Sequence, residues 1–192
     1  MYSAEIQENL HEGSTVIIVS AISRSSVYYE IIDGDESGLF AINPNSGTIS
    51  CTKRLDYETT NFFNLTVQAT NMVNQKAKSN LLVHVLDTND NSPVFKRDIY
   101  VGNITESAVI GSVALDGEGM PLVTSAEDKD SELNALLVYE IVDKMAQKYF
   151  MIDPSTGKLF SLHLDFLSAF FSRNLKARDM KISEGNLIRK GK

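Results

Sequence analysis

The sequence lacks a long run of apolar residues and contains a single cysteine among its 192 residues. A membrane-spanning helix needs about twenty consecutive apolar residues, and no window approaches that length. Met1 is followed by the polar and acidic residues 2–5 (YSAE) instead of a basic segment and an apolar core, so no export signal is expected. If the protein acts outside the cell, we therefore expect the sequence to be an excerpt, or a product whose export signal has been lost or left out. Cys51 cannot form an intrachain disulfide, which fits a cytosolic protein and a disulfide-free extracellular domain equally well.

The sequence is acidic, but its charge is distributed unevenly. The net charge is −7 at pH 7, and residues 166–192 carry seven Lys and Arg against two acids, which leaves residues 1–165 near −12. An acidic body repels nucleic acid and anionic membranes, and it favours cations where carboxylates converge. We therefore expect no nucleic-acid partner.

An internal repeat organises the chain. Two blocks recur at an offset of 110 residues: 40–47 (FAINPNSG) with 150–157 (FMIDPSTG), and 29–31 (YEI) with 139–141 (YEI). Upstream, residues 6–9 pair with 104–107 at an offset of 98, so the first repeat is twelve residues shorter between Glu8 and Tyr29. Two blocks in register indicate two related domains in tandem.

Each repeat has the periodicity of β-strands. Apolar and polar residues alternate over residues 64–69 and 80–85, as they do in a strand with one buried face. Turn signals rich in Asp, Asn, Pro and Gly interrupt such runs every 8 to 15 residues, the spacing expected of an antiparallel sandwich. An unrelated pair of all-β domains remains the alternative.

Oxygen-bearing side chains crowd the junction between the repeats, where residues 87–95 read DTNDNSPVF. Ca²⁺ takes roughly six to eight oxygen ligands from carboxylates, amides and backbone carbonyls, and this segment offers all three. It has no thiolate or imidazole for zinc. The segment therefore predicts a divalent-cation site, although Asp- and Asn-rich segments are also common as simple turns.

Residues 87–95 resemble the DxNDNxPxF linker of the cadherin superfamily, and the other cadherin motifs occur in the expected order. Residues 55–58 (LDYE) resemble the LDxE motif, Glu8 occupies the family's xEN position, and residues 128–130 (DKD) resemble the DxD motif. The resemblance covers residues 4 to about 160 and implies an all-β fold of tandem Greek-key, immunoglobulin-like β-sandwiches, the second one incomplete. The implied organisation is a first repeat at 1–95 with a calcium linker at 87–91, a partial second repeat at 96–164, and a divergent basic tail at 165–192.

The same resemblance implies metal ligands from both repeats. Those from the first repeat and linker are Glu8, Asp56, Glu58, Asp87 and Asp90. Those completing the sites are Asn89, Asp128 and Asp130, with backbone carbonyls of Thr88, Asn91 and Asn134. The carboxylates would repel one another without Ca²⁺, so we expect an empty joint to flex and a filled joint to stiffen.

The implied function is calcium-dependent cell-cell adhesion on the extracellular face of the plasma membrane. The partners would be other cadherin ectodomains, homophilic or heterophilic, and membrane attachment would come only from parts of the parent protein absent here. The alternative is a truncated, soluble fragment that binds calcium without adhering. Two glycosylation sequons, 64–66 (NLT) and 103–105 (NIT), fit a secreted domain, and strand alternation places Asn64 outside.

An enzyme is not expected. Asp56 with Glu58, at i and i+2, gives no sign of an acid and base flanking a sugar, as a carboxylate-based hydrolase would need. The three histidines follow no metal-ligand spacing: His11, His84 and His163.

The sequence departs from the family pattern in two places. The first repeat has no DxD motif in residues 20–24, and Asn71 stands where an aspartate is usual, so any preceding junction is expected to be poor in calcium, as in Fat-type atypical cadherins. After Gly157 the pattern is lost, and no later strand pair is expected. Residues 165–192 are predicted to be disordered or to form a basic amphipathic helix, and a sequence accident such as a frameshift is favoured over a purposeful segment.

Overall fold

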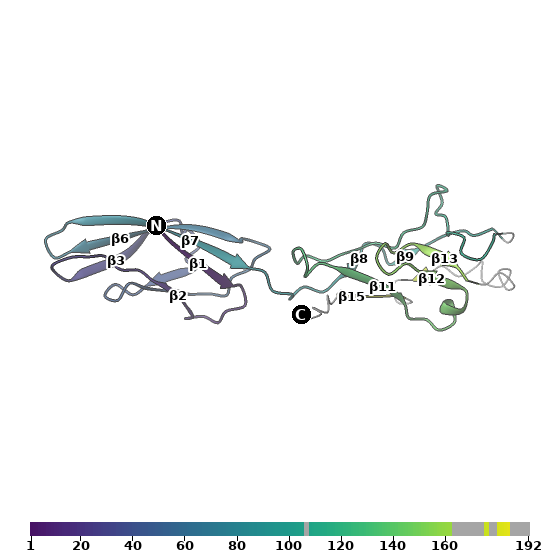
Figure 1. Ribbon diagram of the computed structural model, residues 1–192, viewed down its shortest axis with the longest axis horizontal. Coiled ribbons are helices and arrows are strands. Elements are labelled where there is room, and N and C mark those ends of the chain that lie inside the picture. The colour runs from purple at the N-terminus through teal and green to yellow at the C-terminus, as the bar shows by residue number, and fades with distance from the viewer. Residues whose placement is uncertain (106–107, 163–174, 177–179, 185–192) are drawn as a thin grey trace, which may run out of the picture. The chain divides into compact units, whose positions relative to one another are not determined.

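The computed structural model describes residues 1–105, 108–162, 175–176 and 180–184. The chain divides into two compact units, Met1–Thr88 and Asn89–Lys192, so the boundary falls inside the linker predicted at 87–91. Both units consist of β-strands (Figure 1). Within the described residues the only helix is a short 3-10 turn, η1 (Ala146–Lys148). The predicted all-β class is confirmed.

The first unit is a sandwich of two sheets. Its strands are β1 (Tyr2–Gln7), β2 (Thr15–Ile18), β3 (Val27–Asp33), β4 (Phe40–Ile42), β5 (Thr48–Cys51), β6 (Phe62–Asn71) and β7 (Lys76–Leu86). One sheet has the order β1-β7-β6-β3 and the other β2-β5-β4. β1 runs parallel to β7, whereas the remaining pairs in this unit are antiparallel.

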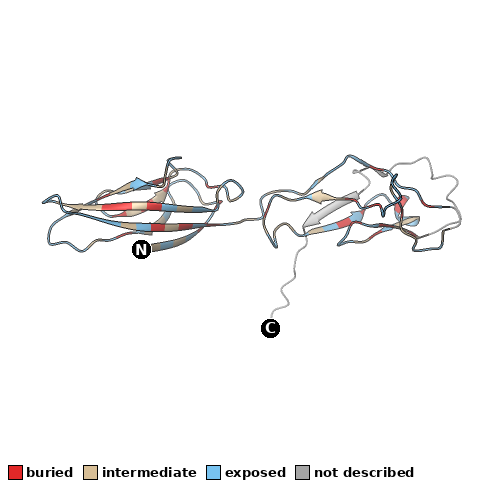
Figure 2. Ribbon diagram, turned by 90° about the horizontal axis from the view of Figure 1, so that it is seen from above, coloured by how far each residue is buried: buried red, intermediate tan, exposed pale blue. Residues whose placement is uncertain are grey.

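Residues from both sheets fill the core of this sandwich. Leu81, Val83 and Val85 of β7 are buried while their neighbours are more exposed, which confirms the predicted alternation. Figure 2 shows buried residues in red along the middle of the long strands. Ile49 of the second sheet and Leu65 of the first are both 0% exposed. Burying such a side chain fully contributes about 1.5–3 kcal/mol to folding, so this core holds the two sheets together.

The second unit is built of shorter strand pairs. Its strands are β8 (Val94–Phe95), β9 (Ile99–Tyr100), β10 (Ala126–Glu127), β11 (Leu137–Ile141), β12 (Phe150–Ile152), β13 (Leu159–Ser161), β14 (Leu175–Lys176) and β15 (Met180–Glu184). The pairs are β10 with β8, β11 with β15, β12 with β13, and β14 with β9. A separate core that includes Tyr100, Ile104, Tyr139 and Leu159 lies inside this unit.

The described part of the predicted tail differs from the prediction. Residues 175–176 and 180–184 are strands, whereas the sequence predicts disorder or a helix over 165–192. β14 pairs with β9 and β15 pairs with β11, both antiparallel. Strand formation here depends on these distant partners, which supply backbone hydrogen bonds that no local pattern reveals. The remaining residues of 165–192 lie outside the described part of the chain.

The internal repeat is present in the hydrogen bonds as well as in the sequence. Four backbone hydrogen bonds of 2.9 Å correspond in pairs: Val19 N to Gly47 O with Thr124 N to Gly157 O, and Tyr29 N to Pro44 O with Tyr139 N to Pro154 O. Gly47 and Gly157 have φ of +69° and +68°. The two hairpins, β4-β5 and β12-β13, are therefore built alike.

The extra residues of the second repeat fall in two places. The Gly13 N–H bond to Cys51 O corresponds to the Gly111 N–H bond to Ser161 O, and the two glycines are at an offset of 98. The offset rises to 105 at Val19 and Thr124, across a hairpin in which Leu115 pairs with Pro121. It rises again to 110 at Tyr29 and Tyr139, across the loop that carries Asp128 and Asp130. The loop with the predicted DxD motif is thus five residues longer than its counterpart in the first unit.

Replacing Gly47 tests the packing of the β4-β5 hairpin. A Cβ on Gly47 would lie 2.2 Å from the carbonyl oxygen of Val19, whereas Gly38, with φ +63°, has open space around the added atom. A non-glycine residue in the left-handed region costs about 1–3 kcal/mol. We expect Gly38→Ala to lower the free energy of unfolding by that amount and Gly47→Ala to lower it by more. Chemical denaturation followed by circular dichroism measures both, and equal losses would contradict the close contact with Val19.

Asp153 gives the corresponding turn of the second unit a pH dependence. The backbone N–H of Thr156 and the hydroxyl of Ser155 hold the pKa of Asp153 at about 2. A carboxyl with a lowered pKa stabilises the fold above its ordinary pKa of about 3.9, and this contribution is lost as the pH falls toward 2. We expect an NMR titration of this carboxyl to give a midpoint near 2. Asp153→Asn, which copies Asn43 of the first unit, should keep the turn and abolish its pH dependence, and a parent midpoint near 4 would contradict these hydrogen bonds.

Candidate metal centre

Glu8 is a buried carboxylate that follows β1 directly. The parallel pairing of β1 with β7 sets Gln7 opposite Leu86, so Glu8 lies beside the residues that follow β7. Its Oε1 accepts the backbone N–H of Thr88 and its Oε2 accepts that of Tyr57, both at 2.7 Å. Glu8 is 1% exposed. Because a buried polar group needs hydrogen-bond partners, these two donors fix the Glu8 side chain between the loop before β6 and the start of the linker.

Two further carboxylates join Glu8 in the first unit. Asp56 and Glu58 lie in the loop between β5 and β6, and one oxygen of each lies within 4.8 Å of the other and of a Glu8 oxygen. The loop is anchored by Leu55, which is 4% exposed, and by the Tyr57 N–H bond to Glu8. Three of the predicted ligands are therefore brought together by the fold of one unit.

Burial, hydrogen bonds and neighbouring charges shift the pKa values of two carboxyls in this cluster. Desolvation, a hydrogen bond with Asp56 and the charges of Glu8 and Asp56 raise the pKa of Glu58 to about 7. Hydrogen bonds from the hydroxyl of Thr59 and from Glu58 lower the pKa of Asp56. A site that resists a further negative charge is one in which a cation is favourable.

The predicted ligands of the second unit also gather. Asp130 is 5% exposed and accepts the side-chain N–H of Asn91 at 2.7 Å and the backbone N–H of Asn91 at 3.2 Å. Asn91 also donates to Asp90 Oδ1 at 3.1 Å, and Asp128 Oδ1 accepts the backbone N–H of Asp130 at 3.1 Å. The linker residues of this unit are thus tied to the DxD loop by hydrogen bonds.

In each unit, a side chain among the predicted ligands has a buried oxygen atom without a hydrogen-bond partner among the described residues. Thr88 Oγ1 in the first unit and Asp128 Oδ2 in the second are buried, and neither has a hydrogen-bond partner among the described residues. A buried polar atom left in this state costs about 1–3 kcal/mol. Ca²⁺ is bound by carboxylate, amide and carbonyl oxygens, and the clustered side chains carry only oxygen donors. The residues present fit a hard divalent cation and do not fit zinc.

The remaining predicted ligands lie in or beside the same segments. Asp87 directly follows β7 and is half-buried, and Asn89 is exposed. Asn134 is half-buried and donates its N–H to Ser131 O at 2.9 Å, in a turn after the DxD loop. The predicted set therefore divides into one group in each unit.

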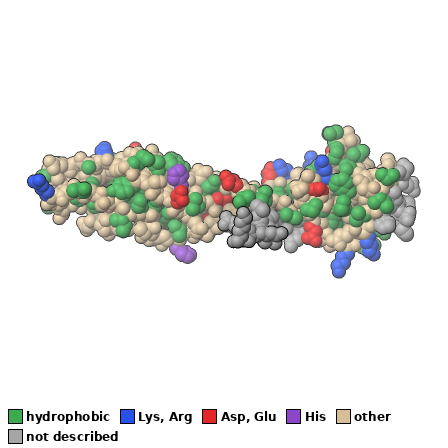
Figure 3. Space-filling view, viewed as in Figure 1, with side chains coloured by type: hydrophobic (Ala, Val, Ile, Leu, Met, Phe, Trp, Pro, Cys, Tyr) green, Lys and Arg blue, Asp and Glu red, His purple; other side chains and the backbone are tan. Residues whose placement is uncertain are grey.

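The first unit has a counterpart of the DxD loop without its carboxylates. The Ser25 N–H donates to Ser23 Oγ at 3.2 Å, in the same i+2 to i pattern as Asp130 to Asp128. This loop lines a groove of about 700 Å³ together with Asn71 and Lys76, at the opposite end of β7 from Glu8. No cluster of three metal-binding side chains lies at this end of the fully described residues 1–88. Figure 3 shows Lys and Arg side chains there, in blue.

Sequence reasoning missed the groups that hold the carboxylates in place. These are backbone N–H groups of Tyr57 and Thr88 and the hydroxyl of Thr59. The threonine three residues after Asp56 was a usable signal, because Thr hydroxyls often bond to nearby Asp side chains in turns. The backbone donors cannot be recognised from residue type.

Among the described residues, no helix has the length and apolar character that a membrane span requires.

Comparison with known proteins identifies relatives for almost the whole chain. Residues 2–86 match the Cadherin domain family. The chain is 46% identical to human Protocadherin Fat 1 over 181 residues, which cover 93% of this chain and 4% of that protein. It is 40% identical to the Fat-like cadherin-related tumor suppressor homolog of Drosophila melanogaster over 181 residues, 92% of this chain and 4% of that protein. The chain thus spans about 4% of the length of these relatives.

These alignments extend into residues 165–192. The alignment to human Protocadherin Fat 1 leaves 7% of the chain outside, which is fewer residues than the 28 of that segment. A segment that arose by a frameshift is not expected to align with a relative. The observation therefore argues against the sequence accident favoured from the motif pattern.

Solved structures agree with the family match. The crystal structure of mouse Cadherin-23 EC22-24 matches with a TM-score of 0.73 and 26% identity, over 84% of this chain and 51% of that chain. Human Protocadherin-24 EC1-2 matches with a TM-score of 0.69 and 26% identity, over 85% of this chain and 74% of that chain. The predicted cadherin-like fold and the Fat-type relationship are confirmed. The chain belongs to the cadherin superfamily, as a non-enzymatic structural module whose relatives include Fat-type protocadherins.

Proposed function

We propose that this chain is a calcium-rigidified adhesion module, one link in the ectodomain of a large transmembrane cadherin. The observation that carries the proposal is the presence of two clusters of carboxylate side chains, one in each unit that the short linker joins. Glu8, Asp56 and Glu58 cluster in the unit that ends at Thr88. Asp90 and Asp130 are tied together through Asn91 in the unit that begins at Asn89.

The chain's own residues would bind Ca²⁺. Glu8, Asp56, Glu58, Asp87 and the linker residue Asp90 would hold the ions together with Asn89, Asp128 and Asp130, and with carbonyls of Thr88, Asn91 and Asn134. Bound calcium would supply the positive charge that offsets the carboxylates. Because the ligands belong to both units, binding would stabilise one arrangement of the linker over others. The stiffness of the joint would then depend on calcium.

Adhesion and location are properties of the whole protein. This chain corresponds to about 4% of the length of its relatives. The module would lie on the extracellular face of the plasma membrane, and attachment would come from segments outside this sequence. Other cadherin ectodomains, homophilic or heterophilic, would be its partners. Any junction with a preceding repeat would be poor in calcium, because Ser23 and Ser25 occupy the loop positions that Asp128 and Asp130 occupy in the second unit.

An extracellular location makes the two sequons candidate glycosylation sites. Asn64 lies on an exposed position of β6, and its Oδ1 accepts the side-chain N–H of Asn80 at 2.9 Å on the outer face of the sheet. Asn103 is exposed and precedes the buried Ile104. Both side chains would project glycans away from the two cores.

Calcium should stabilise residues 1–192 against heat. Ligand binding to the folded state adds about 2.7 kcal/mol at a free concentration 100 times the Kd, which for units of this size raises Tm by on the order of 10 °C. We expect this shift between chelator and calcium in the parent, and a shift smaller by more than half in Glu58→Gln, Asp90→Ala and Asp130→Asn. Differential scanning calorimetry measures it.

Glu36→Gln is the matched control, because Glu36 is an exposed acid in the turn after β3 and should leave the calcium shift intact. Small-angle X-ray scattering with and without calcium reports the stiffness of the joint separately. A parent whose melting curve ignores calcium would remove the metal from the proposal. A parent stabilised by calcium with unchanged scattering would remove the rigidification alone.

Export through an animal secretory pathway should glycosylate Asn64. Oligosaccharyl transfer joins Asn64 Nδ2 to the first sugar as the lipid diphosphate leaves, and the sequon needs Thr66. We expect peptide N-glycosidase to shift the mass of the secreted parent. Asn64→Gln should lose one glycan, whereas Asn80→Gln, which alters the neighbouring asparagine outside any sequon, should keep it. An unglycosylated Asn64 peptide by mass spectrometry would refute the assignment.

A further inference from the structure

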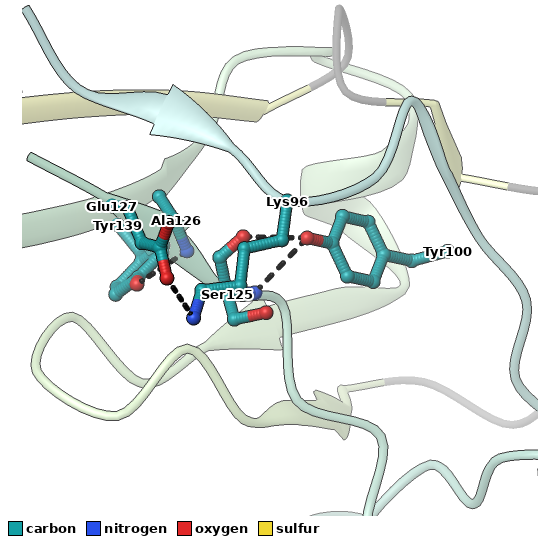
Figure 4. Close-up of polar contacts among 6 residues, drawn as sticks. All are labelled: Lys96, Tyr100, Ser125, Ala126, Glu127 and Tyr139. Carbon is teal, nitrogen blue, oxygen red and sulfur yellow. Dashed lines mark hydrogen bonds and ion pairs between the residues drawn. The ribbon is translucent and has the colours of Figure 1, made fainter.

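Two tyrosines hold the loop that leads to Asp128 and Asp130. Figure 4 shows the Tyr100 and Tyr139 hydroxyls directed at the backbone of Ser125 and Ala126. Tyr100 donates to Ser125 O at 2.5 Å and accepts the Ser125 N–H at 3.2 Å. Tyr139 accepts the Ala126 N–H at 3.2 Å. We call these contacts the tyrosine clamp of residues 100, 125, 126 and 139.

The clamp links the loop to the rigid part of the unit. Tyr100 is 3% exposed and Tyr139 is 8% exposed, and both rings belong to the core of the second unit. Lys96 supports the same loop, since its N–H donates to Ser125 O at 2.9 Å and its Nζ forms an ion pair with Glu127. A buried ring cannot shift without disturbing the core. The backbone just before Asp128 is therefore fixed by groups that touch no predicted ligand.

The first unit contains the same clamp on a loop without carboxylates. Tyr2 donates to Ser20 O at 2.7 Å and accepts the Ser20 N–H at 3.1 Å, and Tyr29 accepts the Ala21 N–H at 3.0 Å. The loop that follows carries Ser23 and Ser25, in the positions of Asp128 and Asp130. The chain thus provides two versions of one device, of which only the second leads to metal-binding side chains.

We propose that Tyr100 and Tyr139 are positioning residues for the cation half-site of the second unit. Their hydroxyls hold Ser125 and Ala126 so that Asp128 and Asp130 are placed for a divalent cation before it arrives. Ligands held in advance lose less conformational freedom on binding, which raises affinity without an added contact. The inference rests on the proposed calcium function, because positioning has no purpose without the ion.

The clamp predicts a loss of calcium affinity from changes that leave every ligand intact. We expect Tyr139→Phe to weaken calcium binding by about 3- to 10-fold, the range for loss of one neutral hydrogen bond. Tyr100→Phe removes two such bonds and should weaken binding at least as much. Tyr29→Phe and Tyr2→Phe remove the equivalent hydroxyls from the first unit and should leave the Kd unchanged. Isothermal titration calorimetry on residues 1–192, at a temperature where circular dichroism shows each variant folded, measures the Kd.

Hydrogen-deuterium exchange without calcium separates positioning from a merely structural role. Exchange over residues 125–130 should rise in Tyr139→Phe while exchange over β11 and β13 stays as in the parent. Tyr139→Phe is the decisive variant if the more buried Tyr100→Phe fails to fold. A parent that binds calcium while Tyr139→Phe binds it equally well would overturn the clamp and leave the proposed function standing. Equal weakening in Tyr29→Phe would also overturn it, and a parent that binds no calcium would remove both proposals.

Discussion

The parallel pairing of β1 with β7 is the constraint on which the candidate metal centre depends. Its register sets Gln7 opposite Leu86, so Glu8 comes to lie where the linker begins. Two backbone N–H groups then hold the Glu8 carboxylate in a buried position. A slip of one residue would turn every side chain of β1 to the other face of the sheet, and Glu8 would leave the cluster. The anionic character of this end of the unit is therefore a property of the sheet as much as of its loops.

Local patterns were sufficient for the fold class, and the family resemblance named candidate ligands of which three lie in one cluster of the first unit. The alternation of residues 64–69 and 80–85 predicts β6 and β7, because a sheet with one buried face imposes that period. Motif order predicts that Glu8 meets the loop containing Asp56, which it does within one unit. The donors that hold Glu8 and the tyrosine clamp could not be predicted, since they join residues far apart through backbone atoms or phenol groups that no spacing rule relates. The strands β14 and β15 could not be predicted for the same reason, because their partners are the distant strands β9 and β11.

The internal repeat separates the scaffold from its chemistry. Both repeats keep the positive-φ glycine at the hairpin, the backbone bonds around it and the tyrosine clamp. They differ in the loop after the clamp, which is longer in the second unit and carries Asp128 and Asp130 in place of Ser23 and Ser25. Seryl hydroxyls preserve the turn but supply no charge, so the same backbone can serve a cation in one repeat and not in the other.

The two ends of the first unit therefore have opposite electrostatic character. Each residue of a strand advances about 3.3 Å, so the length of β7 separates the Glu8 cluster from the Ser23 groove by roughly 35 Å. Over that distance salt at physiological strength screens any interaction between exposed charges. Calcium bound beside Glu8 would thus act on the linker at positions 87–91 and leave the other end unaffected. A tandem array built from such units would be stiff at some junctions and compliant at others, and the choice at each junction would depend on a few carboxylates rather than on a different fold.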